Sequence, residues 1–314
     1  MRALRVADGT TSLVDVAEPR PQGEALVRVL LSGICSTDLE IARGYAGFRG
    51  TIGHEFVGTV EDPGGGPLAR GQRVVGEINA GCGSCALCAA GDPRHCPERT
   101  VLGIVGRDGA HADLLRLPAR NLLPVPPTVP DEHAVFVEPL AAACGILERC
   151  PIEPGARIAI LGDGKLGLLC AMALADLRPL LVGKHAEKRK LAGDIETSSI
   201  EDARRRGRSF DVAIDATGDP SGFTLALDLL RPQGALVLKS TFHGGMPIDA
   251  ARIVVDEIRV IGSRCGRFAP ALDLLARDAV DVGSLIDQVV SLDHAEDAMR
   301  RAASPGVLKV LLAR

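Results

Sequence analysis

The chain of 314 residues has few aromatic side chains: it has no tryptophan, one tyrosine and seven phenylalanines. A surface that binds single strands by stacking their bases needs aromatic rings, so this chain has little to build one from. The net charge is −4 and no long basic run occurs, which argues against phosphate backbones and anionic lipid surfaces as partners. We therefore expect neither a nucleic-acid partner nor a membrane.

Long apolar segments are absent as well. No run of about 18 apolar residues occurs, so no membrane-spanning helix is expected. Residues 1–22 alternate like a strand and lack the charged start and apolar run of an export signal, so a cytoplasmic protein is the expectation. With 46% hydrophobic and 24% charged residues the chain can form a substantial core, and its length predicts about two domains.

Cysteine, in contrast, is plentiful, with nine residues. Four of them, Cys82, Cys85, Cys88 and Cys96, lie in the glycine-containing stretch GCGSCALCAAGDPRHC. Thiolates at these spacings can form a closed tetrahedral shell around one zinc ion, which holds a loop in place and takes no part in catalysis. A disulfide cluster or a set of buried thiols is the alternative; the expected compartment and the regular spacing disfavour both.

The pattern of strands divides the chain. Residues 24–32, 56–60 and 71–79 read as short strands separated by glycine and proline turns, which predicts a compact, mostly β domain over about residues 1–140. Beyond residues 126–130, strands alternate with amphipathic helices, as in a parallel sheet covered by helices. Residues 307–312 read as a closing strand that returns to the first domain.

A glycine motif in residues 157–177 predicts a dinucleotide site. Gly162, Gly164 and Gly167 form GxGxxG between an apolar strand and a helix. The first glycine permits the tight turn, the second lets the backbone approach a pyrophosphate, and the third lets the helix pack against the strand. The helix N-terminus then presents its partial positive charge to the phosphates.

The end of the next strand bears on which cofactor is bound. An acidic residue there would accept a hydrogen bond from the ribose 2′-hydroxyl of NAD, but this chain has Gly183, followed by Lys184, His185 and Lys188. Cationic side chains without a carboxylate favour NADP over NAD. The alternative is a solvated basic helix start that does not discriminate between the cofactors.

Two further motifs carry a family resemblance. GICSTD (33–38), then GHEFVG (53–58), then the cysteine stretch resemble the zinc-containing medium-chain alcohol and polyol dehydrogenases, and the resemblance covers nearly the whole chain. It implies an α/β fold with a GroES-like mostly-β catalytic domain (1–140 and 264–314) and a doubly wound parallel-sheet Rossmann domain (141–263). It also implies two zinc ions per chain, a small-molecule alcohol or carbonyl substrate, and a homodimer or homotetramer.

The residues themselves favour a second, open zinc site. Cys35 and His54 supply a thiolate and an imidazole, a pair that suits zinc better than magnesium or calcium. A catalytic zinc needs a third protein ligand and one open position. Glu138 in EPLA matches the third-ligand position of polyol, glucose and threonine dehydrogenases, and Cys144, six residues later, is the competing candidate.

The resemblance also implies roles around this metal. Asp38 would orient the imidazole of His54, as carboxylates commonly do for metal-bound histidine. Glu55 would approach the metal directly, and Thr37 would take the proton from the substrate alcohol. Many relatives carry a histidine three residues after that hydroxyl to pass the proton on; here Glu40 stands there, either as its replacement or as a solvated carboxylate.

Further contacts follow from the resemblance. Tyr45 and Phe48 would line the substrate pocket, with ordinary packing as the alternative. The residues implied in cofactor binding, besides those above, are Lys165, Leu166, Ala216, Thr217, Gly218, Ser240, Thr241, Ser263, Arg264 and Lys309. Lys309 would meet the pyrophosphate or be a plain exposed strand lysine. The sequence thus predicts reversible oxidation of an alcohol, polyol or sugar hydroxyl to a carbonyl by hydride transfer to NAD(P). An NADPH-dependent carbonyl reductase and a non-catalytic cofactor-binding scaffold are the alternatives.

Overall fold

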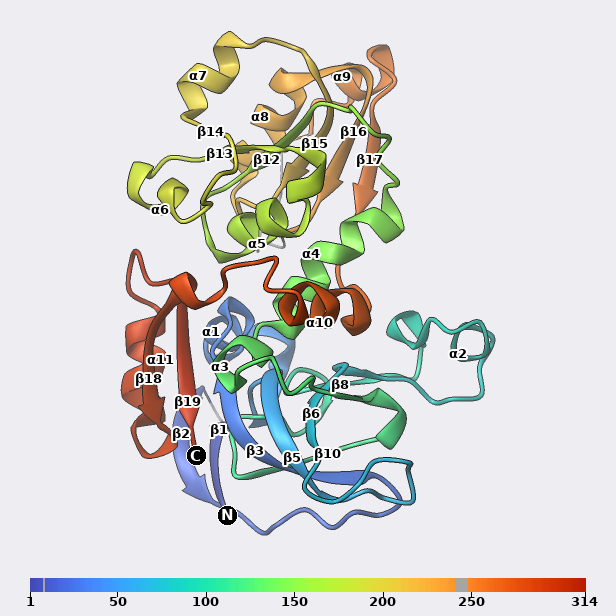
Figure 1. Ribbon diagram of the computed structural model, residues 1–314, viewed down its shortest axis with the longest axis vertical. Coiled ribbons are helices and arrows are strands. Elements are labelled where there is room, and N and C mark those ends of the chain that lie inside the picture. Colours follow the sequence, from blue (N-terminus) through green and yellow to red (C-terminus); the bar gives the residue numbers. More distant parts are fainter. Residues whose placement is uncertain (8, 241–247) are drawn as a thin grey trace. The chain divides into compact units, whose positions relative to one another are not determined.

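The computed structural model describes residues 1–7, 9–240 and 248–314 (Figure 1). The chain forms two compact units. The first comprises Met1–Glu138, Leu275–Asp278 and Leu285–Arg314, and the second comprises Pro139–Leu274 and Ala279–Ser284. Residues 264–274, which the sequence analysis assigned to the first domain, thus belong to the second unit. Among the described residues, no helix is both long and apolar enough to cross a membrane.

The first unit consists mainly of β structure, as predicted. Its largest sheet has the strand order β11-β6-β5-β3-β19-β18, with β10 beside β3. The strands are β3 (Ala25–Gly33), β5 (Glu55–Asp62), β6 (Arg73–Gly76), β10 (Leu114–Leu117), β11 (Leu122–Pro124), β18 (Ile286–Ser291) and β19 (Lys309–Ala313). Only β18 and β19 pair in parallel; the other neighbours are antiparallel. The last strand of the described chain is therefore inserted beside β3, near the start of the sequence.

Two small sheets and four short helices complete the first unit, with strand orders β2-β1-β4 and β7-β8-β9. Their strands are β1 (Arg2–Ala7), β2 (Thr10–Asp15), β4 (Gly50–Thr51), β7 (Asn79–Ala80), β8 (Thr100–Leu102) and β9 (Gly106–Arg107). The helices are α1 (Ser36–Ala42), α2 (Ala86–Ala89), α3 (Asp131–Ala134) and α11 (Ala295–Ala302).

Alternation along β3 explains how this unit forms its core. Ala25, Val27, Val29 and Leu31 are buried, while the three residues that alternate with them, Leu26, Arg28 and Leu30, are only partly buried. This period of two places one face of the strand in the interior. Ala25, Val27 and Val29 pack in a cluster that also contains Phe56 of β5.

The second unit is built on a parallel sheet of order β14-β13-β12-β15-β16-β17. Its strands are β12 (Ile158–Leu161), β13 (Leu180–Val182), β14 (Thr197–Ser198), β15 (Phe210–Asp215), β16 (Leu230–Leu238) and β17 (Arg259–Gly262). The chain order reverses between β12 and β15, as in a doubly wound dinucleotide-binding sheet, which confirms the predicted fold. β14 has only two residues, so the sheet is short at this edge.

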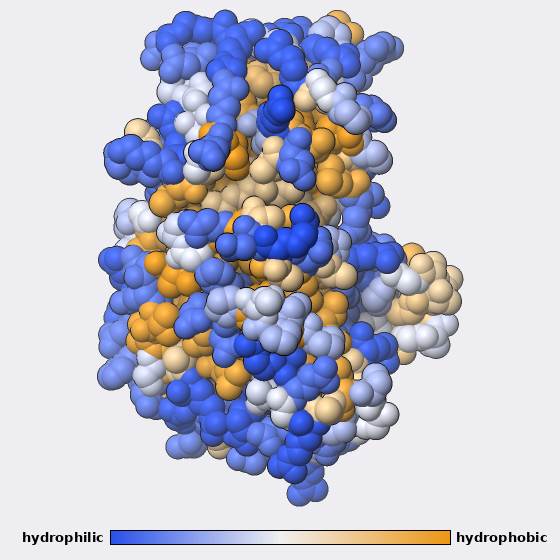
Figure 2. All heavy atoms as spheres, viewed as in Figure 1, coloured by the Kyte–Doolittle hydropathy of each residue, from blue (hydrophilic) through white to orange (hydrophobic). Residues whose placement is uncertain are grey.

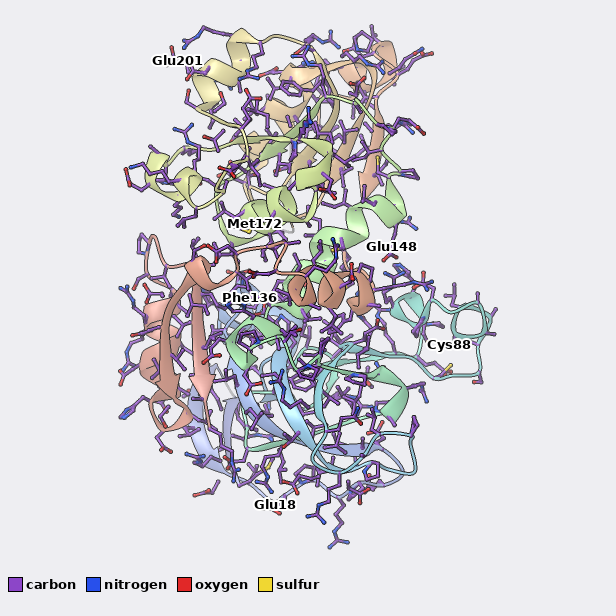
Figure 3. All side chains as sticks on the ribbon, viewed as in Figure 1. Glu18, Cys88, Phe136, Glu148, Met172 and Glu201 are labelled. Carbon is purple, nitrogen blue, oxygen red and sulfur yellow. The ribbon has the colours of Figure 1, made fainter. Side chains whose placement is uncertain are left out.

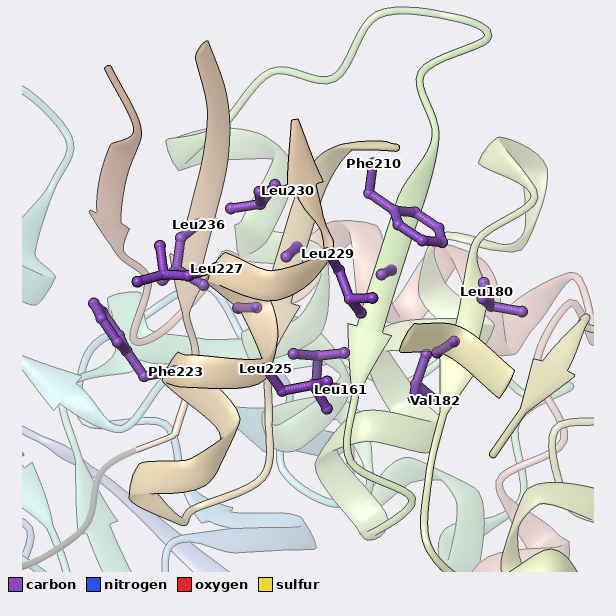
Figure 4. Close-up of a cluster of buried hydrophobic side chains, with 14 of the residues drawn as sticks. Leu161, Leu180, Val182, Phe210, Phe223, Leu225, Leu227, Leu229, Leu230 and Leu236 are labelled. Carbon is purple, nitrogen blue, oxygen red and sulfur yellow. The ribbon is translucent and has the colours of Figure 1, made fainter. Parts of the chain in front are cut away.

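Helices connect these strands, and apolar side chains fill the space between helices and sheet. The helices are α4 (Val137–Arg149), α5 (Lys165–Ala173), α6 (Ala186–Lys190), α7 (Ile200–Arg205), α8 (Pro220–Leu229), α9 (Ala250–Val255) and α10 (Phe268–Ala276). Figure 4 shows one cluster in which Leu161, Val182 and Leu236 of the sheet lie near Phe223 and Leu225 of α8. The strands β12 and β13 are apolar at every position and fully buried, because inner strands of such a sheet are covered on both faces.

Candidate active site and metal centres

The four cysteines of the first motif are brought together in a lobe of the first unit. Their Sγ atoms all lie within 4.8 Å of one another. Helix α2 begins after Cys85 and carries Cys88, which Figure 3 labels in the lobe that also appears at the right of Figure 2. A 3₁₀ turn, Pro93–His95, leads into Cys96, which is fully buried. Four thiol sulfurs this close, with no disulfide among them, suit one tetrahedral zinc ion.

Backbone N–H groups point at these sulfurs, as they would at thiolates. The N–H of Cys82 lies 3.4 Å from Sγ of Cys96, and the N–H of Cys85 lies 3.4 Å from Sγ of Cys82. Hydrogen bonds from the Ser84 hydroxyl, and from the N–H groups of Ser84 and Cys85, lower the pKa of the Cys82 thiol to about 6. For Cys88, the Gly83 N–H lowers the pKa, but desolvation and the three neighbouring thiols outweigh it and raise the pKa to about 11. The group thus favours one thiolate strongly, and a bound cation would favour all four.

A second group of possible metal ligands forms where strand β3 ends and its neighbour β5 begins. β3 ends at Gly33 and leads into Cys35, while β5 begins at Glu55 directly after His54. Gly33 pairs with Glu55 across the two antiparallel strands, so both motifs meet at one edge of the sheet. Ligand atoms of Cys35, His54 and Glu55 all lie within 4.8 Å of one another. A thiol, an imidazole and a carboxylate at this spacing fit a zinc ion.

Asp38 links the GICSTD and GHEFVG motifs by hydrogen bonds to the backbone of both. Its Oδ2 accepts a hydrogen bond of 2.7 Å from the Cys35 N–H, and its Oδ1 accepts one of 3.1 Å from the Gly53 N–H. Oδ1 also lies 3.3 Å from Nδ1 of His54. With Nδ1 directed at Asp38, the other ring nitrogen of His54 is the one left to bind a metal. This arrangement is the one the resemblance implied for Asp38.

Charge and burial act together on this pair. Burial by itself raises the pKa of Asp38, but the charge of His54 and hydrogen bonds from His111 and His54 outweigh it and hold that pKa well below its usual range. Burial likewise lowers the pKa of His54, but Asp38 and Cys35 outweigh it and hold that pKa well above its usual range. The carboxylate of Asp38 is therefore ionised, and it attracts the imidazole of His54 strongly.

Lys309 contacts the group of Cys35, His54 and Glu55 through the carboxylate of Glu55. Its ammonium donates a hydrogen bond to Oε2 of Glu55 and a longer one, of 3.4 Å, to the carbonyl oxygen of Ile34. Both charged side chains are 0% exposed, and the Lys309 Nζ lies 5.4 Å from the centre of the Phe136 ring. A Cβ on Gly33 would lie 2.6 Å from Oε2 of Glu55 and 3.1 Å from Nζ of Lys309. Glycine at position 33 therefore leaves the space that the ion pair occupies.

Helix α1 places the two residues of the predicted proton path one turn apart. The hydroxyl of Thr37 lies 3.9 Å from Sγ of Cys35, so it stands beside the metal group. Glu40, three residues later on the same face, accepts a hydrogen bond of 2.7 Å from Arg43, and its side chain is 37% exposed. The carboxylate thus has a solvated partner, and its part in a proton path stays a prediction.

The third metal ligand stays a prediction as well. Glu138 is the second residue of α4, and Cys144 lies further along the same helix. Among the residues that the structure describes, neither joins the group formed by Cys35, His54 and Glu55. Burial raises the pKa of the Cys144 thiol to about 11.

The two aromatic candidates for the substrate pocket differ in their surroundings. The side chain of Tyr45 is 41% exposed. Phe48 packs against the buried cluster that contains Ile41 and Ile52, and it also lines a cavity of about 470 Å³ together with Arg5 and other residues. Packing therefore accounts for Phe48, and the pocket role of both side chains remains a prediction.

In the second unit, the glycine turn has the geometry that its sequence predicted. Gly162 follows β12 with a φ of +111°, and Gly164 is the residue directly before helix α5. A Cβ on Gly167 would lie 1.8 Å from the carbonyl oxygen of Gly162, so only glycine lets the helix approach the turn. A Cβ on Gly164 would meet nothing within 4 Å, which leaves space for a ligand at the N-terminus of α5, where Lys165 and Leu166 form the first turn.

A carboxylate that was not predicted from the sequence lies against the end of β13. Asp163, in the glycine turn, accepts hydrogen bonds from the backbone N–H of His185 at 2.5 Å and from its Nδ1 at 3.1 Å. A Cβ on Gly183 would lie 2.4 Å from Oδ2 of Asp163, so the carboxylate occupies the place of a side chain at position 183. Lys184 is exposed, Lys188 is partly buried, and the side chain of His185 is 59% exposed. An aspartate inside GxGxxG followed by a glycine at the next strand end is the signal that could have revealed this contact.

The remaining predicted cofactor residues lie at the carboxyl ends of β15, β16 and β17. Ala216, Thr217 and Gly218 follow β15, Ser240 follows β16, and Ser263 and Arg264 follow β17. Thr241 lies outside the described residues. Lys239, also missed, is buried and donates hydrogen bonds to the carbonyl oxygens of Ser263 at 3.1 Å and Arg264 at 2.6 Å, so it ties the ends of two strands together. A lysine directly after an apolar strand was its only sequence signal.

Comparison with known proteins agrees with both units. The family model for the alcohol dehydrogenase GroES-like domain matches residues 21–127, and that for zinc-binding dehydrogenases matches residues 184–277. The erythritol/L-threitol dehydrogenase of Mycolicibacterium smegmatis is 32% identical and is covered over 91% of its length by 93% of this chain.

Two solved structures share the fold over the whole chain. A protein from Sinorhizobium meliloti bound to NADP is 30% identical with a TM-score of 0.87, and an Escherichia coli alcohol dehydrogenase complexed with NADH is 26% identical with a TM-score of 0.91. Each match covers 100% of this chain and 99% of the other. The chain therefore belongs to the zinc-containing medium-chain dehydrogenase family, which confirms the resemblance carried by its sequence motifs.

Proposed function

We propose that this chain reversibly oxidises a hydroxyl group of a polyol or a related small alcohol, with NADP preferred over NAD. Family membership establishes a zinc-dependent, NAD(P)-dependent alcohol dehydrogenase. The observation that carries the proposal is the group of Cys35, His54 and Glu55 with Asp38 directly behind His54. The polyol class is supported by the erythritol/L-threitol dehydrogenase of Mycolicibacterium smegmatis and by Glu138 in EPLA.

The donor set supports zinc at both groups. Cys35 and His54 would hold a catalytic ion together with Glu138 as third ligand, and the four cysteines of the lobe would hold a structural one. When bound, the catalytic zinc supplies Lewis acidity at the substrate oxygen, and the nicotinamide supplies the hydride acceptor. Two zinc ions per chain are therefore expected.

The chain's own side chains would orient the ligands and handle the proton. Asp38 holds the ring of His54 by its Nδ1, which fixes the ligand nitrogen. The hydroxyl of Thr37, beside Cys35, is in place to accept the proton of the substrate alcohol and pass it along helix α1 to Glu40 or to water. Lys309 places a positive charge beside the buried carboxylate of Glu55, next to the metal group, and so offsets part of the cost of burying that charge.

The preference for NADP rests on charge at the end of β13. Lys184, His185 and Lys188 offer cationic partners to a 2′-phosphate, and position 183 has no carboxylate of its own. Asp163 would repel such a phosphate, but it is engaged by the backbone and the ring of His185. Ala216, Thr217, Gly218, Ser240, Ser263 and Arg264 would border the rest of the cofactor.

A homodimer or homotetramer in the cytoplasm completes the proposal. Apolar side chains exposed at one edge of the second unit support self-association: Val254 is 74%, Val255 79% and Val260 41% exposed. The first two belong to α9, which directly precedes β17, the strand at the edge of the sheet that carries Val260, and exposed apolar side chains favour contact with another chain. None of the nine cysteines, all of which lie in the described part of the chain, forms a disulfide, and a reducing compartment would keep them so.

The test combines a metal count with a substrate screen. We expect two zinc ions per chain, and nicotinamide reduction with at least one polyol, faster with NADP than with NAD at equal subsaturating concentrations. One zinc per chain and no turnover of any alcohol, polyol or aldehyde would contradict the enzymatic proposal. Turnover confined to aldehydes with NADPH would instead assign the direction to carbonyl reduction.

A further inference from the structure

Asp38 lies between two imidazoles, and only one of them belongs to the proposed metal group. Oδ1 is 3.3 Å from Nδ1 of His54, and Oδ2 is 3.4 Å from Nε2 of His111. The far side of the second ring is also occupied, because Nδ1 of His111 lies 2.9 Å from the hydroxyl of Ser32. Exposed fractions are 0% for Asp38, 0% for His111, 3% for His54 and 2% for Ser32, so these contacts are made away from water.

The partners of Asp38 divide evenly between its two oxygens. Each oxygen accepts one backbone hydrogen bond, from Gly53 at Oδ1 and from Cys35 at Oδ2, and each lies beside one imidazole. A buried carboxylate is stable as an anion only when such donors replace the water it has lost. His111 is therefore one of four groups that keep Asp38 charged and fix the plane of its carboxylate.

The fold holds the ring of His111 firmly. The N–H of His111 donates a hydrogen bond of 2.9 Å to the carbonyl oxygen of Ile52, and the carbonyl oxygen of His111 accepts one of 2.8 Å from the N–H of Leu4. Gly53 has a φ of +97°, and a Cβ at this position would lie 2.6 Å from the ring of His111. The absence of a side chain next to His54 thus makes room for the second imidazole.

The contacts assign a tautomer to this ring. Ser32 can donate its hydroxyl hydrogen to Nδ1, which leaves the ring proton on Nε2, facing Asp38. A neutral ring in this form accepts a hydrogen bond from Ser32 and turns its Nε2–H toward Oδ2 of Asp38, which lies 3.4 Å away. The four side chains then form one series, from Ser32 through His111 and Asp38 to His54.

We propose that His111 is a positioning residue for the metal site: with its Nε2 at 3.4 Å from Oδ2 of Asp38, the ring fixes the carboxylate that orients His54. The proposal rests on the metal-binding role proposed for His54. Loss of an outer partner of a metal-bound histidine typically weakens metal binding by about 10–100-fold. Because His111 acts one contact further out, we expect about tenfold, the lower end of that range.

Two amide substitutions separate the two faces of the ring. In H111Q the amide N–H can take the place of Nε2–H and still reach Asp38, whereas in H111N the shorter amide can reach only the Ser32 side. Both variants are polar and similar in volume, so general disruption of the core affects them alike. H111F removes both contacts and gives the upper limit of the effect.

The experiment measures zinc affinity by competition with a chromophoric chelator, together with the absorption of the cobalt(II)-substituted protein, with the four-cysteine site as internal reference. We expect H111N and H111F to bind the second zinc about tenfold more weakly than wild type and to shift the cobalt bands, with H111Q restoring both. Equal affinities and spectra for H111N and H111Q would overturn the proposal. A wild-type protein that binds only one metal would instead overturn the proposed function.

Discussion

The buried pair of Glu55 and Lys309 gives the sharpest energetic prediction. Both side chains are 0% exposed, and the ammonium has Glu55, the Ile34 carbonyl oxygen and the Phe136 ring around it. Replacement of Lys309 by methionine keeps much of the side-chain volume but leaves a carboxylate in the interior. Breaking a buried pair in this way costs about 3–5 kcal/mol of unfolding free energy. For a domain of this size that corresponds to a fall in melting temperature of roughly 10 °C.

A double-mutant cycle tests the reasoning. E55Q alone leaves a buried ammonium and should also destabilise, whereas E55Q/K309M removes both charges and should recover at least about 2 kcal/mol relative to the sum of the single changes. The four proteins are compared by urea unfolding followed by circular dichroism, at equal zinc loading. Strictly additive effects would show that the two charges do not stabilise one another.

The pH dependence of K309M is a second check on the same pair. Without the ammonium, the buried carboxyl group of Glu55 should bind a proton in the folded state, because burial raises its pKa above that of the unfolded chain. A group whose folded pKa is raised favours the folded state at lower pH, so the deficit of K309M relative to wild type should shrink between about pH 8 and about pH 5. A deficit that does not change with pH would refute this account.

Three further predictions concern the metals and the cofactor. C88S should lose one zinc per chain and make the lobe sensitive to protease, while C170A, a change at a buried cysteine of the other unit, should keep both metals. E138A should lose the metal at Cys35 and His54, whereas C144A should retain it; the reverse result would make Cys144 the ligand. K184A and H185A should each raise the KM for NADP about tenfold, which is about 1.4 kcal/mol, without changing that for NAD. K190A is the matched control: the Lys190 side chain pairs with Glu187 on the surface, so its removal should change neither the KM for NADP nor that for NAD.

The sequence was sufficient wherever the chemistry is local. GxGxxG predicted the turn because all three glycines act within six residues, and the structure gives Gly167 a contact that no side chain could survive. The four cysteines of the lobe likewise span only 82–96, so their spacing already limits how they can meet. Cys35 and His54 could be paired from their motifs, and the structure places both in one group.

The contacts that the sequence could not predict connect distant parts of the chain. His111 reaches Asp38 because His111 and its neighbour Ala112 pair with residues of β1. Such pairing leaves no periodic pattern in the sequence. Glu55 and His54 are consecutive and would point to opposite faces of a strand, yet both join the metal group, because β5 begins only at Glu55 and Gly53 turns the backbone just before it. The sequence alone predicts only a turn residue at Asp163. The structure adds that Gly183, twenty positions later, lies against its carboxylate.

The insertion of β19 beside β3 has a consequence for how the enzyme is made. Glu55 and Lys309 are separated by 254 positions, so the carboxylate emerges from the ribosome long before its counter-ion. Most of the second unit is synthesised in between and can fold first, whereas the first unit must wait for its final strand. Closing so long a loop comes late, and until then the metal-binding thiol and imidazole stand next to an uncompensated negative charge. The ion pair of Glu55 and Lys309 therefore forms only when β19 joins the sheet.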